Sequence, residues 1–149
     1  MPTHASNKEA FYSYSIDDSL EAGLSLLGHE VKSIKSGQVS LKGAYVTIRN
    51  GEAFLRNAHI GKYKHATNLE GYNETRERKL LLHKQEIHKL QNQTHEKGTA
   101  LIPLELYTKK RNIKLKIGIG RGKKQFDKRE ALKKKEIKRK LERTIRTRI

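Results

Sequence analysis

The fold follows from a hairpin pattern at residues 44–56, which reads Ala44-Tyr45-Val46-Thr47-Ile48-Arg49-Asn50-Gly51-Glu52-Ala53-Phe54-Leu55-Arg56. Apolar and polar residues alternate on both sides of Asn50-Gly51, as they do in half-buried strands. Asn and Gly tolerate the positive φ angles of a type I′ turn, whose twist matches that of the flanking strands. The pattern therefore predicts an antiparallel β-hairpin.

A second hairpin is expected between residues 99–108 and 112–119. In its second strand, Leu115, Ile117 and Ile119 alternate with Lys114, Lys116 and Gly118. Since successive side chains of a strand point to opposite faces, this alternation places an apolar face inward and a lysine face outward.

The segments around these hairpins complete a fold prediction. Residues 24–37 carry apolar side chains among glycines, which indicates one long bent strand with glycines at its kinks. Residues 76–93 have the apolar spacing of a helix, with Gly98 after its end. Hairpins interrupted by one helix favour a mainly β fold, an OB-like closed antiparallel barrel with added helices. That architecture often binds nucleic acid.

The composition changes at Phe126. The last 24 residues hold 11 Lys or Arg against 4 Asp or Glu, a net charge of +7, and Ile137, Leu141, Ile145 and Ile149 recur every four residues. A short helix with so much like charge is marginal in water. We therefore expect a barrel at residues 1–125 and a basic tail at 126–149 that is disordered alone and folds against a polyanion.

Overall charge and composition narrow the function. The 149 residues suffice for one domain, and 33 Lys plus Arg against 16 Asp plus Glu give a formal net charge of +17. Such an excess favours a polyanionic partner, either nucleic acid or an anionic membrane surface. The absence of cysteine excludes disulfide scaffolds, zinc ribbons and thiol nucleophiles. With no apolar stretch long enough to span a membrane and no signal-peptide pattern, we expect a soluble cytoplasmic protein.

The strongest local signal is the segment from Lys109 to Lys124, which has eight basic residues and no acidic one. Lysine and arginine contacts to phosphate supply most sequence-independent affinity for nucleic acid. Glycines at 118, 120 and 122 do not have the spacing of a phosphate-binding loop, and we interpret them as a flexible exit into the tail. The seven histidines form no cluster, and no nucleophile stands beside an evident base. No metal, cofactor or enzymatic activity is predicted.

Six segments, in chain order, then carry a specific resemblance: Glu21-Ala22-Gly23-Leu24, Gly28-His29-Glu30-Val31-Lys32-Ser33, Gly51-Glu52-Ala53-Phe54, Arg76-Glu77-Arg78-Lys79-Leu80-Leu81-Leu82-His83, Lys116-Ile117-Gly118 and Gly122-Lys123-Lys124-Gln125-Phe126-Asp127-Lys128-Arg129. Together they resemble the SsrA-binding protein family, also called small protein B or SmpB. The resemblance is collinear from about Asn7 to the C-terminus.

The resemblance implies a binding factor that is not an enzyme. Proteins of this family bind transfer-messenger RNA (tmRNA) and carry it into stalled ribosomes for trans-translation, a form of ribosome rescue. The barrel takes the place of the missing anticodon arm, and the tail enters the empty mRNA channel beside 16S rRNA, where the small-subunit decoding centre reads it. Elongation factor Tu and the alanyl-tmRNA complex belong to the same pathway, and no membrane or cofactor is implied.

The resemblance also implies site residues. The tmRNA contacts fall on Glu21, Arg78, Lys79, Leu81, His83, Lys114 and Lys116. The contacts to the decoding centre and mRNA channel fall on Lys123, Lys124, Phe126, Asp127, Lys128, Arg129, Ile137 and Leu141. Glu21 can accept hydrogen bonds from base amino groups, or it can form a structural ion pair. Leu81 can equally belong to the core, and His83 can stack on an unpaired base.

Two classes of protein remain as alternatives. A structural ribosomal protein that binds rRNA permanently would also be small, basic and tailed. An RNA-modifying or RNA-cleaving enzyme would need a catalytic set that the sequence does not offer. The RNA that copurifies from cells would separate these classes.

Overall fold

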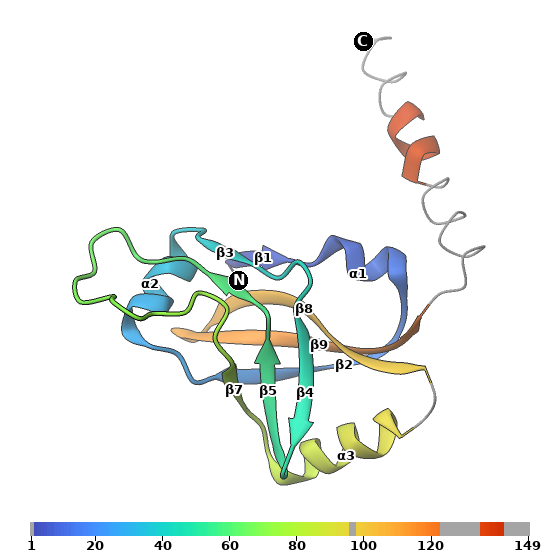
Figure 1. The fold of residues 1–149 in the computed structure, drawn as a ribbon. Helices are drawn as coiled ribbons and strands as arrows, with labels where there is room; N and C mark the ends of the chain where they lie inside the picture. The colour runs from blue at the N-terminus through green and yellow to red at the C-terminus, as the bar shows by residue number, and fades with distance from the viewer. Residues whose placement is uncertain (1, 96–97, 123–134, 142–149) are drawn as a thin grey trace.

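Antiparallel strands dominate the protein, whose computed structural model describes residues 2–95, 98–122 and 135–141 (Figure 1). The elements are, in order, β1 (Thr3–Ser6), α1 (Lys8–Ser13), β2 (Tyr14–Leu24), α2 (Gly28–Lys35), β3 (Val39–Ser40), β4 (Tyr45–Arg49), β5 (Glu52–Arg56), β6 (His59–Ile60), β7 (Arg78–Leu81), α3 (Lys84–Thr94), β8 (Thr99–Lys109) and β9 (Asn112–Gly122). Residues 135–141 are also helical.

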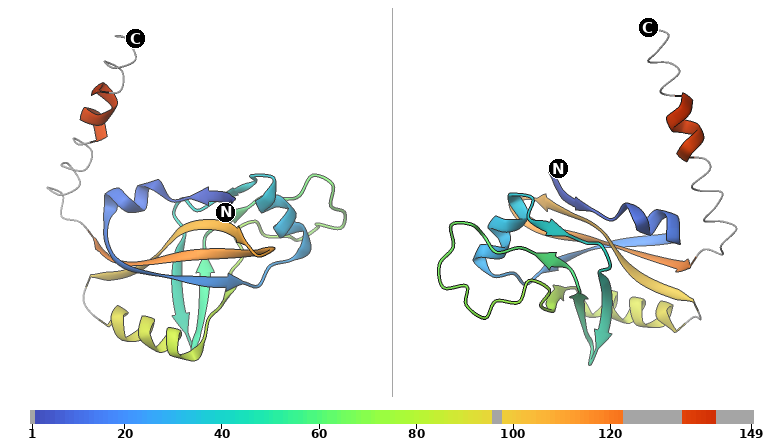
Figure 2. Two further views of the ribbon diagram at one scale, coloured as in Figure 1. Left: turned by 180° about the vertical axis from the view of Figure 1, so that it is seen from behind. Right: turned by 45° about the horizontal axis from the view of Figure 1, so that its top comes forward.

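Seven strands form one curved antiparallel sheet in the order β1-β8-β9-β2-β7-β5-β4, and β3 pairs separately with β6. The mainly β fold with added helices is therefore confirmed, but the expected closed barrel is wrong. β1 and β4 are the two edges of the sheet, and no strand of the described chain hydrogen-bonds them together. Figure 2 shows this sheet from two further directions.

The N-terminal segment occupies part of the edge of β8 that does not pair with β9. β1 pairs with Glu105, Leu106 and Tyr107 of β8. The N–H of Asn7 then donates to the carbonyl of Leu104 at 2.8 Å, and its side-chain amide donates to the carbonyl of Pro103 at 3.0 Å. β4 lies near β8 without hydrogen-bonding to it, and a hollow of about 310 Å³ opens beside α1, between residues 43–45 and residues 100–102.

Both predicted hairpins are confirmed. β4 and β5 pair from Tyr45–Arg56 to Arg49–Glu52, and the turn residues Asn50 and Gly51 have φ angles of 53° and 74°. β8 and β9 pair along their length, down to Lys109–Asn112. The second hairpin is longer than expected, because β9 continues to Gly122.

Residues 24–37 do not form the long bent strand that we expected. β2 ends at Leu24, and α2 follows at Gly28–Lys35. The Glu30 carboxylate accepts the N–H of Leu27 at 2.8 Å, which caps the first turn, and Gly37 ends the helix with a φ of 85°. The glycines that looked like strand kinks thus mark the two ends of a helix.

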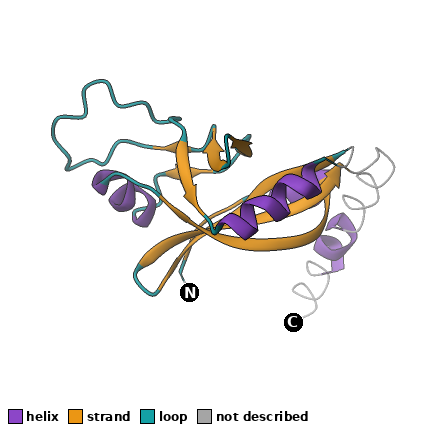
Figure 3. Ribbon diagram, turned by 90° about the horizontal axis from the view of Figure 1, so that it is seen from below, coloured by secondary structure: helices purple, strands orange, loops and turns teal. Residues whose placement is uncertain are grey.

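The helix predicted at residues 76–93 is confirmed only in its second half. Residues 78–81 form strand β7, which pairs with both β2 and β5, and α3 begins at Lys84. Lys79, Leu80 and Leu81 favour a helix by themselves, but they form a strand here because pairing with β2 and β5 joins two otherwise separate halves of the sheet. Leu80 fills the core from β7, and Leu90 is buried from α3, which lies along the underside of the sheet (Figure 3).

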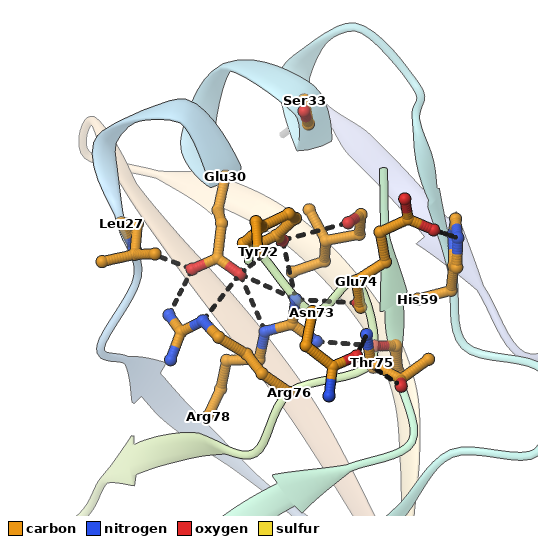
Figure 4. Close-up of polar contacts among 12 residues, drawn as sticks. Leu27, Glu30, Ser33, His59, Tyr72, Asn73, Glu74, Thr75, Arg76 and Arg78 are labelled. Carbon is orange, nitrogen blue, oxygen red and sulfur yellow. Dashed lines mark hydrogen bonds and ion pairs between the residues drawn. The ribbon is translucent and has the colours of Figure 1, made fainter. Parts of the chain in front are cut away.

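One ionic cluster holds the long loop of residues 61–77 against α2 (Figure 4). The side chains of Glu30 and Arg78 are both fully buried, and Glu30 Oε2 accepts from Arg78 Nε at 2.9 Å and from Nη2 at 2.7 Å. Arg76 also donates to both carboxylate oxygens, and the Tyr72 hydroxyl donates to Oε2 at 2.9 Å. The remaining Arg78 donors bond to the carbonyls of Ala58 at 2.6 Å and Glu74 at 2.9 Å. Since a buried ion pair must be fully hydrogen-bonded to be tolerated, this saturation is what allows the pair in the core.

The cluster also sets the protonation of its members. Burial alone would raise the pKa of Glu30, but hydrogen bonds from Arg76, Leu27, Arg78 and Tyr72 outweigh it and lower the pKa to about 2. Burial, together with the carboxylate of Glu30, raises the pKa of Tyr72 to about 12. Glu30 is therefore ionised and Tyr72 is neutral at physiological pH.

Removing Arg78 should destabilise the protein strongly, because Glu30 would remain as a buried, under-compensated charge. We expect Arg78→Ala to lower the free energy of unfolding by about 3–5 kcal/mol in urea denaturation. The control is Arg49→Ala, which breaks a surface ion pair to Glu77 at 3.0 Å and should cost less than about 1 kcal/mol. Equal losses for the two variants would contradict a structural role of the cluster.

Stability should also fall in acid through Glu30. Its pKa is about 2 in the folded protein against an ordinary value of 4.5, so the stability that Glu30 contributes is fully present above about pH 4.5 and is lost as the pH falls toward 2. At about 1.4 kcal/mol per pKa unit, the shift corresponds to roughly 3 kcal/mol. Urea midpoints measured from about pH 6 to pH 2 should show a shallower decline for Glu30→Gln than for the unmodified chain. The pKa values of Asp18 and Glu21 are also lowered, so these two residues should account for the decline with pH that remains in Glu30→Gln. Parallel pH profiles would contradict this account.

Candidate nucleic-acid interface

The lysines of β9 lie on the face of the sheet opposite the core. Ile113, Leu115 and Ile117 are buried, whereas Lys116 is exposed and Lys114 is half-buried. The prediction of one inward and one lysine-bearing face is confirmed for this strand. Within the described residues, neither lysine takes part in an ion pair to a carboxylate.

Strand register brings predicted contacts from three strands side by side. Lys114 of β9 lies opposite Gly23 of β2, and Gly23 lies opposite Leu81 of β7. Two residues along these strands, Lys116 lies opposite Glu21. We call the surface formed by the side chains of Glu21, Lys79, Leu81, Lys114 and Lys116 the outer face.

Gly23 is what lets the outer face come together. A Cβ atom at Gly23 would lie 3.3 Å from the Leu81 Cβ and 3.7 Å from the Lys114 Nζ, in tight contact with its neighbour on β7. Leu81 is 54% exposed, so it is not the core residue that the Leu80-Leu81-Leu82 run also allowed. An exposed apolar side chain among cations offers a contact for the flat surface of a base.

The outer face continues into a groove of about 550 Å³ at the start of α3. Lys79, Leu81, His83 and Lys114 all line it, together with Gly51, Glu52, Leu80, Leu82, Lys84 and Ile87. His83 is the N-cap residue of α3, and its backbone N–H donates to Glu86 at 3.0 Å while its ring stays exposed. Four of the predicted RNA contacts thus share one groove.

Glu21 is positioned by two residues of β8. The Tyr107 hydroxyl and Lys109 Nζ, the latter at 3.4 Å, both donate to Glu21 Oε2. The hydrogen bond from Tyr107 is the main reason why the pKa of Glu21 is lowered, and burial followed by this carboxylate raises the pKa of Tyr107. Glu21 is ionised and about one-third exposed, and no donor from the described residues engages Oε1. Glu21 therefore forms the structural ion pair through Oε2, and its Oε1 atom can still accept a hydrogen bond.

Sequence analysis missed Tyr107. It lies opposite Lys114 in the β8–β9 ladder, and only that register places its hydroxyl at Glu21. A single tyrosine in an apolar strand carries no spacing signal of its own.

Arg78 requires a correction. We expected it to contact RNA, but its side chain is fully buried and its guanidinium is committed to Glu30, Ala58 and Glu74. Its neighbour Lys79 does reach the surface, where it forms an ion pair with Glu52 at 3.4 Å. Alternation along β7 explains both positions, since adjacent strand residues face opposite sides.

The basic segment from Lys109 onward begins at an unusual turn. Lys110 and Arg111 have φ angles of 47° and 70°, in the left-handed region that favours glycine. This turn presents two cations at the tip of the β8–β9 hairpin.

Two of the three glycines that follow, Gly118 and Gly120, are not part of a flexible exit, which corrects that interpretation for them, whereas Gly122 is the exposed last residue of β9. Gly118 and Gly120 are buried within β9. A Cβ atom would lie 2.8 Å from the Leu104 Cδ1 at Gly118 and 2.4 Å from the Ser15 carbonyl oxygen at Gly120. The backbone of β2 therefore leaves room only for glycine at position 120, and at position 118 a larger residue would have to displace the buried side chain of Leu104.

The predicted tail contacts fall largely outside the described residues, and these are Lys123, Lys124, Phe126, Asp127, Lys128 and Arg129. Ile137 and Leu141 are described, within the helical residues 135–141. They are 52% and 59% exposed, and they are one turn apart on one side of the helix. Lys135 Nζ lies 4.6 Å from the centre of the Tyr12 ring of α1.

Within residues 2–95, 98–122 and 135–141, no three His, Asp or Glu side chains gather as metal ligands would. No helix in those ranges is long and apolar enough to cross a membrane.

Known proteins resemble this chain over nearly its full length. The family model described as SmpB protein matches residues 4–147. The SsrA-binding protein of Enterococcus faecalis is 49% identical over 95% of this chain and 91% of its own, and that of Shouchella clausii is 47% identical over 97% and 92%. A chain in the solved structure "tmRNA-SmpB: a journey to the center of the bacterial ribosome" superposes with a TM-score of 0.69 at 36% identity, covering 89% of this chain and 95% of that one. These similarities, on a chain whose outer face gathers the predicted contacts, show that the protein belongs to the SmpB family of SsrA-binding proteins.

Proposed function

We propose that the protein binds tmRNA and delivers it to stalled ribosomes in trans-translation, as a binding factor without catalytic activity. The observation that carries this proposal is the convergence of Lys79, Leu81, His83 and Lys114 in one groove beside Glu21. Family membership and the similarity to a chain from a tmRNA–SmpB structure support the choice of RNA.

The outer face and its groove offer each kind of contact that an RNA loop needs. Lys114 and Lys116 supply positive charge for phosphates. Leu81 and the exposed ring of His83 offer surfaces for unstacked bases. The free Oε1 atom of Glu21 can accept a base amino group or a ribose hydroxyl. Because Tyr107 and Lys109 hold the other oxygen, Glu21 is oriented before the RNA arrives.

The proposed division of labour assigns tmRNA binding to residues 1–125 and the ribosome to residues 126–149. In this view, the tail enters the empty mRNA channel next to 16S rRNA, and Lys123, Lys124, Phe126, Asp127, Lys128 and Arg129 reach the decoding centre. The exposed apolar pair Ile137 and Leu141 supports a helix that rests one face on the channel wall. Elongation factor Tu and the alanyl-tmRNA complex would be the partners during delivery, in the cytoplasm.

The test of RNA binding is the double variant Lys114→Ala/Lys116→Ala. We expect weaker tmRNA binding in a gel-shift titration and a slope of log affinity against log salt that is smaller by about 1–2, because two phosphate contacts are lost. Lys35→Ala/Lys42→Ala removes the same charge from exposed positions outside the outer face and should change the slope far less. An unchanged slope with a lowered unfolding temperature would show that the β9 lysines serve packing, and would overturn the proposal.

The tail should be required after tmRNA has bound. Ile137→Pro breaks a helix at a cost of roughly 3 kcal/mol and should abolish tagging of proteins made from messages without stop codons. Affinity for tmRNA should remain unchanged, because Ile137 lies outside residues 1–125. The control is Ile137→Ala, which removes the apolar side chain but is compatible with a helix. Comparing the two variants shows whether a loss of tagging comes from the broken helix or from the missing side chain. Normal tagging by Ile137→Pro in an in-vitro assay would mean that the tail acts as an unstructured basic tether.

A further inference from the structure

A second groove, of about 440 Å³, opens between the end of α2 and the start of the loop of residues 61–77. It is lined by Ser36, Gln38, Lys62, Tyr63, Lys64 and His65. Figures 1 and 2 show this loop beside α2, and none of these residues belongs to the strands of the outer face. None of the residues predicted to contact tmRNA, the decoding centre or the mRNA channel lines this groove.

Aromatic rings and cations alternate in this groove. The rings of Tyr63 and His65 meet edge to face, with centres 5.5 Å apart and planes at 70°. Lys32 Nζ reaches over from α2 and lies 5.7 Å from the centre of the Tyr63 ring. Rings interleaved with lysines are what single-stranded nucleic acid requires, since bases stack on the rings and phosphates meet the cations.

The groove is held in place by the backbone beneath it. The Ser33 hydroxyl, buried in α2, donates to the Gly61 carbonyl at 2.7 Å, and the Gly61 N–H donates to the Gln38 carbonyl at 2.9 Å. The N–H of Ala66 closes a turn onto the Tyr63 carbonyl at 3.0 Å. A ligand would therefore meet a backbone and a pair of rings, those of Tyr63 and His65, that are already positioned, which lowers the ordering cost of binding.

The charge of the groove selects an anion. Lys32, Lys62 and Lys64 are exposed, and the residues that line the groove include no carboxylate. Three acids of α2 and the adjoining loop form ion pairs, Glu30 with Arg76 and Arg78, Glu74 with His59 and Glu77 with Arg49, and the exposed Glu70 is the fourth acid of these segments. An acidic peptide would satisfy the lysines but would leave the two rings without a role, whereas an RNA strand uses both.

We propose that this groove is a second RNA-binding site, which takes an unpaired base on Tyr63 and its flanking phosphates on Lys32, Lys62 and Lys64. It goes beyond the proposed function, because it adds a contact on α2 and the adjoining loop that is independent of the outer face. With two such surfaces, the protein can hold two RNA segments at once.

The experiment uses the full chain and a single-stranded RNA of about ten nucleotides carrying 4-thiouridine, a length within the footprint of small RNA-binding surfaces. After irradiation, the cross-linked residues are located by peptide mass spectrometry. We expect an adduct within residues 61–66. Its yield should fall roughly tenfold in Tyr63→Leu and survive in Tyr63→Phe, because only the aromatic variant still stacks. Tyr45→Leu, at a tyrosine that is 46% exposed on β4, is the matched control and should leave the adduct unchanged.

Two outcomes would overturn the proposal. They are adducts confined to the outer face and the tail, or an undiminished adduct in Tyr63→Leu. The double variant Lys114→Ala/Lys116→Ala should retain the adduct. Failure of this site and failure of the outer face are therefore distinguished in the same assay.

Discussion

The buried pair of Glu30 and Arg78 is the interaction on which the rest of the structure depends. Arg78 begins β7, the strand that joins β2 to β5, and Glu30 lies on the buried face of α2. Their hydrogen bonds, with those of Tyr72 and Arg76, tie α2 and the loop of residues 61–77 to the centre of the sheet (Figure 4). Because neither charge can remain buried alone, all of these elements must be in place together.

The Glu30–Arg78 pair helps to position both candidate RNA surfaces. On one side, Arg78 fixes β7 so that Lys79 and Leu81, the alternate residues, point outward beside Gly23. On the other side, the same cluster fastens the end of the loop whose beginning carries Tyr63. An arginine that touches no RNA therefore positions the residues that we propose do. In the segment from Arg78 to Leu81, buried structural residues alternate with exposed candidate contacts. The two kinds of residue can be told apart only once this segment is known to be a strand.

The sequence predicted what local chemistry decides. Asn50-Gly51 specifies its own turn, and the alternation of β9 specifies which side of the strand is basic, so both hairpins and the lysine face were found. The predictions were wrong where the structure of a segment depends on contacts with residues far away in the chain. Residues 78–81 are helix formers that become a strand only because β2 and β5 flank them, and the strand order that leaves β1 and β4 at the edges depends on pairings between segments far apart in the chain. The buried role of Arg78 and the position of Tyr107 follow from the same long-range register.

The two surfaces differ in how they are built, and the difference bears on what each can recognise. The outer face lies on paired strands, where Glu21 is held by Tyr107 and Gly23 brings Leu81 and Lys114 together, so its geometry suits one particular RNA shape. The groove at Tyr63 lies on a loop anchored at Gly61, with cations on flexible stems and rings that accept any base. Stacking and phosphate contacts carry little sequence information. We therefore expect the outer face to bind one RNA specifically, and the groove at Tyr63 to bind an adjacent single strand with little sequence preference.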